Sequence, residues 1–352
     1  MNSLGTAHHN ARQPTMSLNE PVKPESSWQR DLAAAVRNPK ALLAALGLSE
    51  QDIPEVSAEA TAEFPLLVPL SFLDRMEAGN PDDPLLRQVL PVEAEQTTVP
   101  GFGVDAVGDG AARQAAGLLQ KYHGRVLMIA AGSCAVHCRY CFRRSYPYSD
   151  EPKRLSDWEP AIHQVADDET VREVILSGGD PLMLQNQGLA ALVERIDAID
   201  HVDRIRLHTR LPIVLPSRVD TELLKLLQSV RAQVVVVVHA NHANEIQGDC
   251  RDALEQLVSS GFPVLNQTVL LKGINDTVEA LERLSSGLIN IGVLPYYLHQ
   301  LDRVAGTAHF EVSTETGRRL IAQLRDCLPG YAVPRLVQEI PGRGSKTSLE
   351  VT

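Results

Sequence analysis

The sequence predicts an α/β protein, a partial (β/α)6 barrel with an N-terminal helical subdomain and a short C-terminal segment. Short β-branched runs alternate with helical stretches six times after residue 120. These runs are apolar almost throughout, as expected for parallel strands covered by helices. A cysteine-rich loop directly follows the first run, and loops at the carboxyl ends of barrel strands carry chemistry. A doubly wound sheet also fits the alternation, but six units rather than eight favour a partial barrel.

The chain divides into four predicted parts. Residues 1–26 are polar and rich in Pro and Ser, which predicts a disordered tail. Residues 27–120 are expected to form the helical subdomain, because apolar residues recur at helical spacing and prolines interrupt them. Residues 121–310 are expected to form the barrel, and residues 311–352 the C-terminal segment.

The strands and the starts of several helices can be placed from local patterns. Asp220 is an expected N-cap, and Ser156 with Glu159 and Asp276 with Glu279 are expected capping boxes. The six expected strands are RVLMIAA (125–131), VREVILS (171–177), VDRIRLHT (202–209), AQVVVVVHA (232–240), FPVLNQTVLL (262–271) and INIGVLPYYL (289–298).

Composition limits the partners and the compartment. The net charge of −11 argues against a nucleic-acid-binding surface, although it allows a local basic pocket. No apolar run is long enough to cross a bilayer, and the N-terminus lacks the apolar region of a secretory signal. Cys250 and Cys327 are solitary, which favours a reducing compartment. We therefore expect a cytoplasmic protein without a membrane or nucleic-acid partner.

Three cysteines form the most informative motif. Cys134, Cys138 and Cys141 have the spacing C-x3-C-x2-C. Closely spaced thiolates in a chain without another cysteine cluster indicate a metal site rather than a disulfide framework. Three thiolates holding a [4Fe–4S] cluster would leave one iron open for a cofactor. The alternative is a zinc loop completed by His137 or by a distant residue.

This spacing, with Tyr140 just before the third cysteine, resembles the signature of the radical S-adenosylmethionine (SAM) enzymes. In that family the open iron binds the methionine part of SAM. Paired glycines let the backbone approach a ligand closely, and a glycine pair follows the second expected strand. The resemblance implies that this loop holds SAM, through Ser177, Gly178, Gly179 and Asp180.

A second resemblance joins this motif to the C-terminal segment 338–346. Together they are similar to the lysine 2,3-aminomutases, and the similarity covers about residues 64–352, including DPLLRQVLP (83–91), SGGDPLML (177–184) and PYYLHQLD (295–302). It implies an isomerase that uses SAM and pyridoxal phosphate (PLP) to convert (S)-α-lysine to (R)-β-lysine. Lys346 would form the Schiff base with PLP, and Lys121 and Arg125 would bind the PLP phosphate.

The resemblance also implies how substrate L-lysine is held. Arg143 would bind its carboxylate, for which a planar guanidinium is suited. Asp302 and Glu339 would bind its side-chain ammonium group. Glu339 stands where the family has an aspartate, which keeps the charge but adds a methylene and would change the depth of the ammonium pocket.

The chain has no further cysteine group and has six residues after Lys346. In these two respects it resembles the shorter branch of the family, the elongation factor P β-lysylation enzymes. That branch implies a functional link to elongation factor P and its β-lysine ligase, an unidentified electron donor and no zinc. The alternatives are a catabolic or osmolyte-producing lysine 2,3-aminomutase, a glutamate 2,3-aminomutase, and a non-catalytic iron–sulfur or zinc-binding module.

Overall fold

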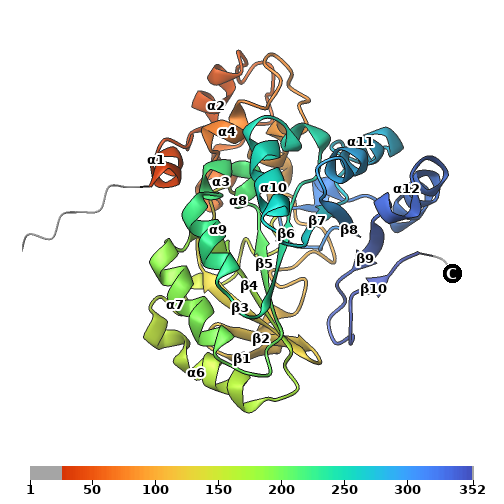
Figure 1. Ribbon diagram of the computed structural model, residues 1–352. Coiled ribbons are helices and arrows are strands. Elements are labelled where there is room, and N and C mark those ends of the chain that lie inside the picture. The colour runs from red at the N-terminus through yellow and green to blue at the C-terminus, as the bar shows by residue number, and fades with distance from the viewer. Residues whose placement is uncertain (1–25, 351–352) are drawn as a thin grey trace, which may run out of the picture.

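The computed structural model describes residues 26–350 and places them around one ten-stranded sheet (Figure 1). The strands follow one another across the sheet in chain order. The expected tail 1–26 lies outside the described residues, except for Ser26. The strands are β1 (Arg113–Ala115), β2 (Leu118–Tyr122), β3 (Arg125–Ala131), β4 (Glu173–Gly178), β5 (Arg204–Thr209), β6 (Gln233–Val238), β7 (Val264–Val269), β8 (Leu294–His299), β9 (Arg335–Gln338) and β10 (Thr347–Ser348).

The six expected strands are present as β3 to β8. Each pairs in parallel with the next, so the predicted partial barrel is confirmed. Short strands extend it at both ends: β2 pairs antiparallel with β3 and β1 with β2, while β9 is parallel to β8 and β10 antiparallel to β9. Strand β2 spans residues 120 and 121, where the sequence suggested the boundary between subdomain and barrel.

Helices cover the outer face of the parallel strands (Figure 1). The N-terminal segment contributes α1 (Ser27–Ala33), α2 (Pro39–Ala45), α3 (Ala58–Glu63), α4 (Leu70–Leu73) and α5 (Asp109–Ala112). The later helices are α6 (Leu155–Asp167), α7 (Asn186–Asp197), α8 (Leu211–Val214), α9 (Thr221–Gln228), α10 (Asp249–Ser259), α11 (Val278–Ile289) and α12 (Thr314–Cys327). Single 3-10 turns are η1 (Leu86–Gln88), η2 (Glu93–Gln96), η3 (Tyr148–Asp150), η4 (Pro181–Met183), η5 (Pro216–Arg218), η6 (Ala243–Ile246), η7 (Ala308–Phe310) and η8 (Gly330–Ala332).

Helix starts were predicted with mixed success. Asp220 caps α9 as expected, since its side chain accepts a hydrogen bond from the backbone of the first turn. Ser156 is not a cap: it lies inside α6, and Asp157 accepts the bonds at that end. Asp276 is not the cap of α11 either, because Thr277 directly precedes the helix and caps it. In α11 the capping hydroxyl is thus one residue closer to the helix than predicted, whereas in α6 the bonding carboxylate lies one residue further inside the helix than Ser156.

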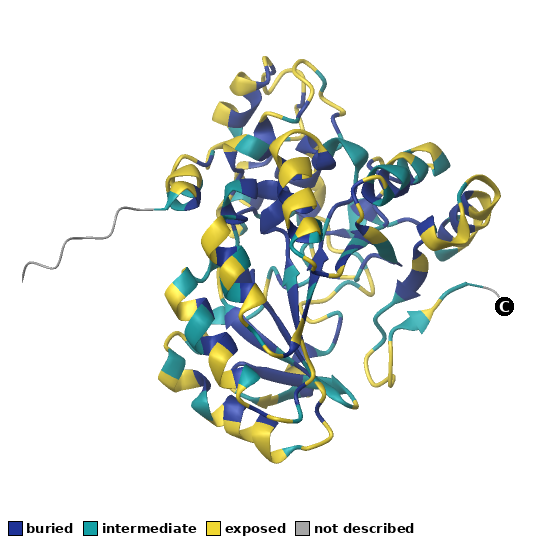
Figure 2. Ribbon diagram, viewed as in Figure 1, coloured by how far each residue is buried: buried dark blue, intermediate teal, exposed yellow. Residues whose placement is uncertain are grey.

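One hydrophobic core joins the N-terminal helices to the barrel. Trp28, Leu42 and Phe72 belong to the same buried cluster as Leu176 and Val236 from the central strands. Figure 2 shows the strands buried and the outer faces of the helices exposed. The N-terminal segment therefore shares the barrel's core and cannot be separated from it without exposing apolar surface.

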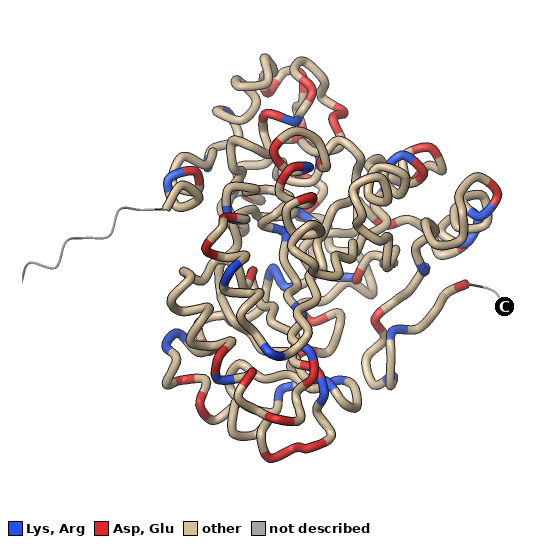
Figure 3. Tube along the Cα trace, in the orientation of Figure 1, with Lys and Arg blue, Asp and Glu red and all other residues tan. Residues whose placement is uncertain are grey.

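Charge lies mainly on the outside. Figure 3 shows acidic and basic residues interspersed over the outer helices. In residues 26–350, no helix has the length and apolar character that crossing a bilayer requires.

Candidate active site

The three cysteines of the motif lie in the loop after β3. Cys134, Cys138 and Cys141 are partly buried and carry free thiols. Burial raises the pKa of Cys134 well above its ordinary value and that of Cys141 to about 11. Within residues 26–350, no three His, Cys, Asp or Glu side chains gather closely enough to hold a single metal ion. A [4Fe–4S] cluster is wider than a single metal ion. Three cysteines that bind such a cluster can therefore lie further apart than the ligands of one ion.

The glycine pair after β4 packs against this cysteine loop. A Cβ added to Gly178 would lie 2.4 Å from the Ala131 carbonyl oxygen, and one added to Gly179 would lie 2.3 Å from the Ser133 carbonyl oxygen. The backbone N–H of Gly179 donates to Ala131 at 2.7 Å, and that of Asp180 donates to Ser133 at 2.9 Å. Both glycines are therefore needed for the two loops to touch. The sequence analysis explains the same glycine pair by a close approach of the backbone to SAM.

The two polar residues flanking the glycines are engaged within the protein. Burial raises the pKa of Asp180 to about 6. Its carboxylate accepts hydrogen bonds from the Thr209 hydroxyl at 2.8 Å and the Arg210 backbone N–H at 2.7 Å. Ser177 accepts a bond of 3.2 Å from the buried guanidinium of Arg143. Asp180 thus joins the loops after β4 and β5.

A buried aspartate that sequence reasoning missed connects two expected ligand-binding cations. Asp109 Oδ1 lies 2.7 Å from Lys121 Nζ, and Asp109 Oδ2 lies 2.7 Å from Arg143 Nε. Burial alone raises the pKa of Asp109, but Arg143 and Lys121 outweigh it and hold the pKa below its ordinary value. The cations assigned to the PLP phosphate and to the substrate carboxylate therefore converge on one carboxylate. Arg125, the other expected phosphate ligand, lies over the ring of Tyr122 at 4.7 Å.

The expected Schiff-base lysine contacts Glu339, one of the two expected ammonium-binding acids. Lys346 Nζ lies 2.9 Å from Glu339 Oε2, in the segment between β9 and β10. The Tyr122 hydroxyl lies 2.6 Å from both oxygens of Glu339. Burial raises the pKa of Glu339, but Lys346 and Tyr122 outweigh it and lower the pKa overall. The protein buries the carboxyl group of Asp302, which raises its pKa to about 6 although Lys346 opposes the rise.

Three histidines at the strand ends present unpaired nitrogen atoms. Among the described residues, the buried Nε2 atoms of His208, His239 and His299 have no hydrogen-bond partner. Burial lowers the pKa of His239 to about 4 and those of the other two well below the ordinary value, so all three are neutral. The positive charge of Lys346 lowers all three pKa values further. Buried polar atoms without partners are rare in a finished core, and these fit a polar cofactor or substrate.

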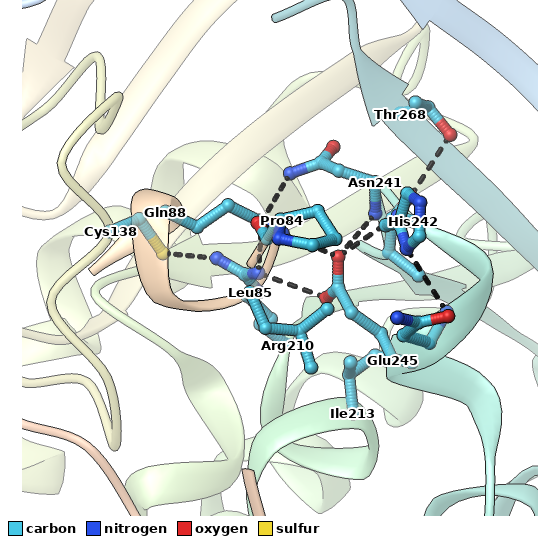
Figure 4. Close-up of polar contacts among 12 residues, drawn as sticks. Pro84, Leu85, Gln88, Cys138, Arg210, Ile213, Asn241, His242, Glu245 and Thr268 are labelled. Atoms are coloured by element: carbon cyan, nitrogen blue, oxygen red, sulfur yellow. Dashed lines mark hydrogen bonds and ion pairs between the residues drawn. The ribbon is translucent and has the colours of Figure 1, made fainter. Parts of the chain in front are cut away.

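A buried network that the sequence did not predict reaches Cys138 through Arg210 (Figure 4). Arg210 Nη1 lies 2.6 Å from the Cys138 sulfur. Arg210 Nη2 donates to Gln88 at 2.7 Å and to Glu245 at 3.0 Å. Asn241 donates to Gln88 at 2.9 Å. Asn241 is a polar residue directly after the expected strand 232–240, a position from which the sequence could have indicated this region.

Comparison with known proteins identifies the family. Residues 128–284 match the Radical SAM superfamily. The chain is 43% identical to the L-lysine 2,3-aminomutase of Escherichia coli over 96% of this chain and 97% of that one, and 43% identical to that of Haemophilus influenzae over 93% and 97%. The Clostridium subterminale enzyme of the same name is 30% identical over 92% of this chain and 78% of its own length.

Similarity to solved structures is weaker. Streptococcus suis SuiB bound to S-adenosylmethionine aligns over 62% of this chain and 51% of its own, with 14% identity and a TM-score of 0.49, too low to identify a shared substrate. The identity to relatives over nearly the whole chain is decisive: the chain belongs to the L-lysine 2,3-aminomutase family, isomerases of the radical SAM superfamily, for which a [4Fe–4S] cluster and S-adenosylmethionine are implied.

Proposed function

We propose that the chain is a PLP-dependent L-lysine 2,3-aminomutase that converts (S)-α-lysine to (R)-β-lysine. One observation carries the proposal: Glu339 contacts the ammonium group of Lys346 at 2.9 Å. That carboxylate already accommodates a primary alkylammonium, which is the group at the end of the substrate side chain. The acids at 302 and 339 suit a cation, so glutamate, whose side chain ends in a carboxylate, is a poorer substrate.

The charges of the site match the two ends of lysine. Arg143 is buried, with Nε on Asp109 and Nη1 on Ser177, and would bind the α-carboxylate through its remaining N–H groups. The side-chain ammonium would bind to Asp302 and Glu339. The positive charge of Lys346 acts to lower the pKa of both acids. Because the positive group binds one end and the negative groups the other, the substrate can enter in one orientation only.

The cofactors would be held by the residues already described. Cys134, Cys138 and Cys141 would bind the cluster, and the loop of Ser177, Gly178, Gly179 and Asp180 would lie beside SAM. When bound, the cluster with SAM supplies a radical and PLP supplies a conjugated system that delocalises it. The PLP residues are Lys346 for the covalent link, and Lys121 and Arg125 for the phosphate.

We further propose that the β-lysine is made in the cytoplasm for elongation factor P and its ligase, with reduction by an electron donor of unknown identity. The matches to the E. coli and H. influenzae relatives cover nearly the whole length of both proteins in each pair, which supports placing this chain in the shorter branch of the family. The second candidate is β-lysine for catabolism or osmolyte supply. Deleting the gene and weighing elongation factor P separates them: loss of a β-lysyl mass is expected, and an unchanged mass would contradict the link.

The activity is tested on the protein reconstituted anaerobically with iron, sulfide and PLP. Incubation with SAM, a reductant and L-lysine should yield β-lysine without net consumption of SAM, and L-glutamate in place of lysine should yield no β-isomer. SAM cleavage with unchanged lysine would contradict the proposal. β-Glutamate formation would identify the rival activity.

A further inference from the structure

Arg210, which directly follows β5, is the one described residue whose side chain both donates to a cluster cysteine and is itself held by a buried carboxylate. Its guanidinium is 7% exposed, and the carboxylate of Glu245 is fully buried. The contact with Cys138 is 2.6 Å from Nη1 to sulfur, while Nη2 contacts Gln88 and Glu245 (Figure 4). An arginine side chain stays protonated at any pH at which the protein is folded, so this guanidinium is cationic.

The guanidinium is fixed from the side opposite the sulfur. Glu245 Oε1 accepts bonds from the backbone N–H groups of Asn241 and His242 at 2.8 and 3.0 Å, and from Gln88 Nε2 at 3.0 Å. Its other oxygen is left for Arg210. If the guanidinium turned away, the buried carboxylate of Glu245 would lose its counter-ion, which strongly disfavours that movement. Gln88 comes from η1, so the N-terminal segment helps to fix this arginine.

The consequence for a cluster follows from charge. Reduction adds one negative charge to the cluster and its thiolates, and a hydrogen bond to a ligating sulfur stabilises that charge. A cationic donor does so more strongly than a neutral one, and in a buried site the effect is weakly screened. We propose that Arg210 is a positioning residue that raises the reduction potential of the cluster through Cys138, with Glu245 and Gln88 holding it in place.

The test is a potentiometric titration of the reconstituted full-length chain with dithionite, followed by the electron paramagnetic resonance signal of the reduced cluster. Each cluster gains one electron from dithionite, and no covalent bond is made or broken. The variant is R210Q combined with E245Q, which removes both charges and leaves the pocket neutral. At a fixed potential its ratio of reduced to oxidised cluster should fall about tenfold, a shift of about 59 mV to more negative potential. R210K, which keeps the charge, should recover part of this shift.

The control is R218Q. Arg218 is also fully buried, but it donates to the carbonyls of Leu182 and Leu184 and touches no cysteine. R218Q should keep the wild-type potential. An unchanged potential in the Arg210 variants with full iron content would overturn the inference, as would an equal shift in R218Q. A shift seen only when SAM is present would also overturn it, because Arg210 would then act on SAM rather than on the sulfur.

A second measurement avoids dependence on how well a variant folds. In wild-type protein labelled with 15N-arginine, pulsed resonance of the reduced cluster should show a nitrogen coupling that R210K weakens. Absence of that coupling in wild type would refute the contact with Cys138. Both measurements omit PLP and lysine, so their failure is distinguishable from failure of the aminomutase activity.

Discussion

Single residues of the site can be ranked by the charge that each carries in the folded protein. Glu339 has a lowered pKa and is charged throughout the neutral range, whereas Asp302 has a pKa raised to about 6. The raised pKa means that protonated Asp302 stabilises the fold at low pH. That contribution is complete below the ordinary pKa of 3.8 and is lost as pH rises through about 6.

This ordering predicts a pH dependence of substrate binding. Below pH 6, Asp302 becomes neutral and no longer attracts the lysine ammonium, so the KM for L-lysine should be about tenfold higher at pH 5 than at pH 7. Initial rates of β-lysine formation across this range measure it. Asp302→Asn should bind lysine at least about tenfold more weakly at pH 7 and lose this pH dependence. An identical pH profile in the variant would assign the titration to another group.

A second residue-scale prediction concerns Lys346. Lys346→Ala should remove the visible absorbance band of PLP bound to the chain while the iron content stays unchanged, because Lys346 lies outside the cysteine loop. Spectra of the reconstituted protein check this. Lys225→Ala, on the exposed face of α9, is the matched control and should keep the band. Persistence of the band in Lys346→Ala would mean that another amine holds PLP.

At the scale of elements, the contact between the β4 loop and the cysteine loop has no spare space. Gly179→Ala would place a methyl group 2.3 Å from the Ser133 carbonyl oxygen, which is backbone and cannot rotate away. We expect the cysteine loop to shift and the iron bound per chain to fall several-fold after reconstitution.

The matched control for this prediction is Gly188→Ala. Gly188 lies in α7 with nothing within 4 Å of an added Cβ, so the change should stabilise the protein by about 0.5–1 kcal/mol. Iron analysis and thermal melting of both variants measure the difference. Full iron content in Gly179→Ala would show that the two loops can separate without harm.

Elements also show what a sequence can predict. The runs that became β3 to β8 were recognisable because strands covered by helices are rich in β-branched and other apolar residues, even though β5 and β7 also carry polar ones. Strands β1 and β10 were not, since Arg113–Ala115 and Thr347–Ser348 are short and polar. Cys134, Cys138 and Cys141 stood out as candidate ligands because all three lie within eight residues of sequence. Arg210 could not be placed, because its contacts to Cys138 and Gln88 span 72 and 122 residues.

At the scale of the whole molecule, the shared core predicts cooperative unfolding. The two tryptophans of the chain report on different parts: Trp28 is buried in α1 and Trp158 in α6. In the single-tryptophan variants Trp28→Phe and Trp158→Phe, fluorescence should give one denaturation midpoint for each protein, coincident with that from circular dichroism. An earlier transition seen only through Trp28 would show that the N-terminal helices unfold separately.

The ends of the sheet have a consequence for how copies of the molecule meet. Its outermost strands, β1 and β10, are three and two residues long and run antiparallel to their neighbours. A strand from a second copy could form few backbone hydrogen bonds with either edge of the sheet. The long apolar strands, which would aggregate readily if exposed, are thereby kept away from such additions.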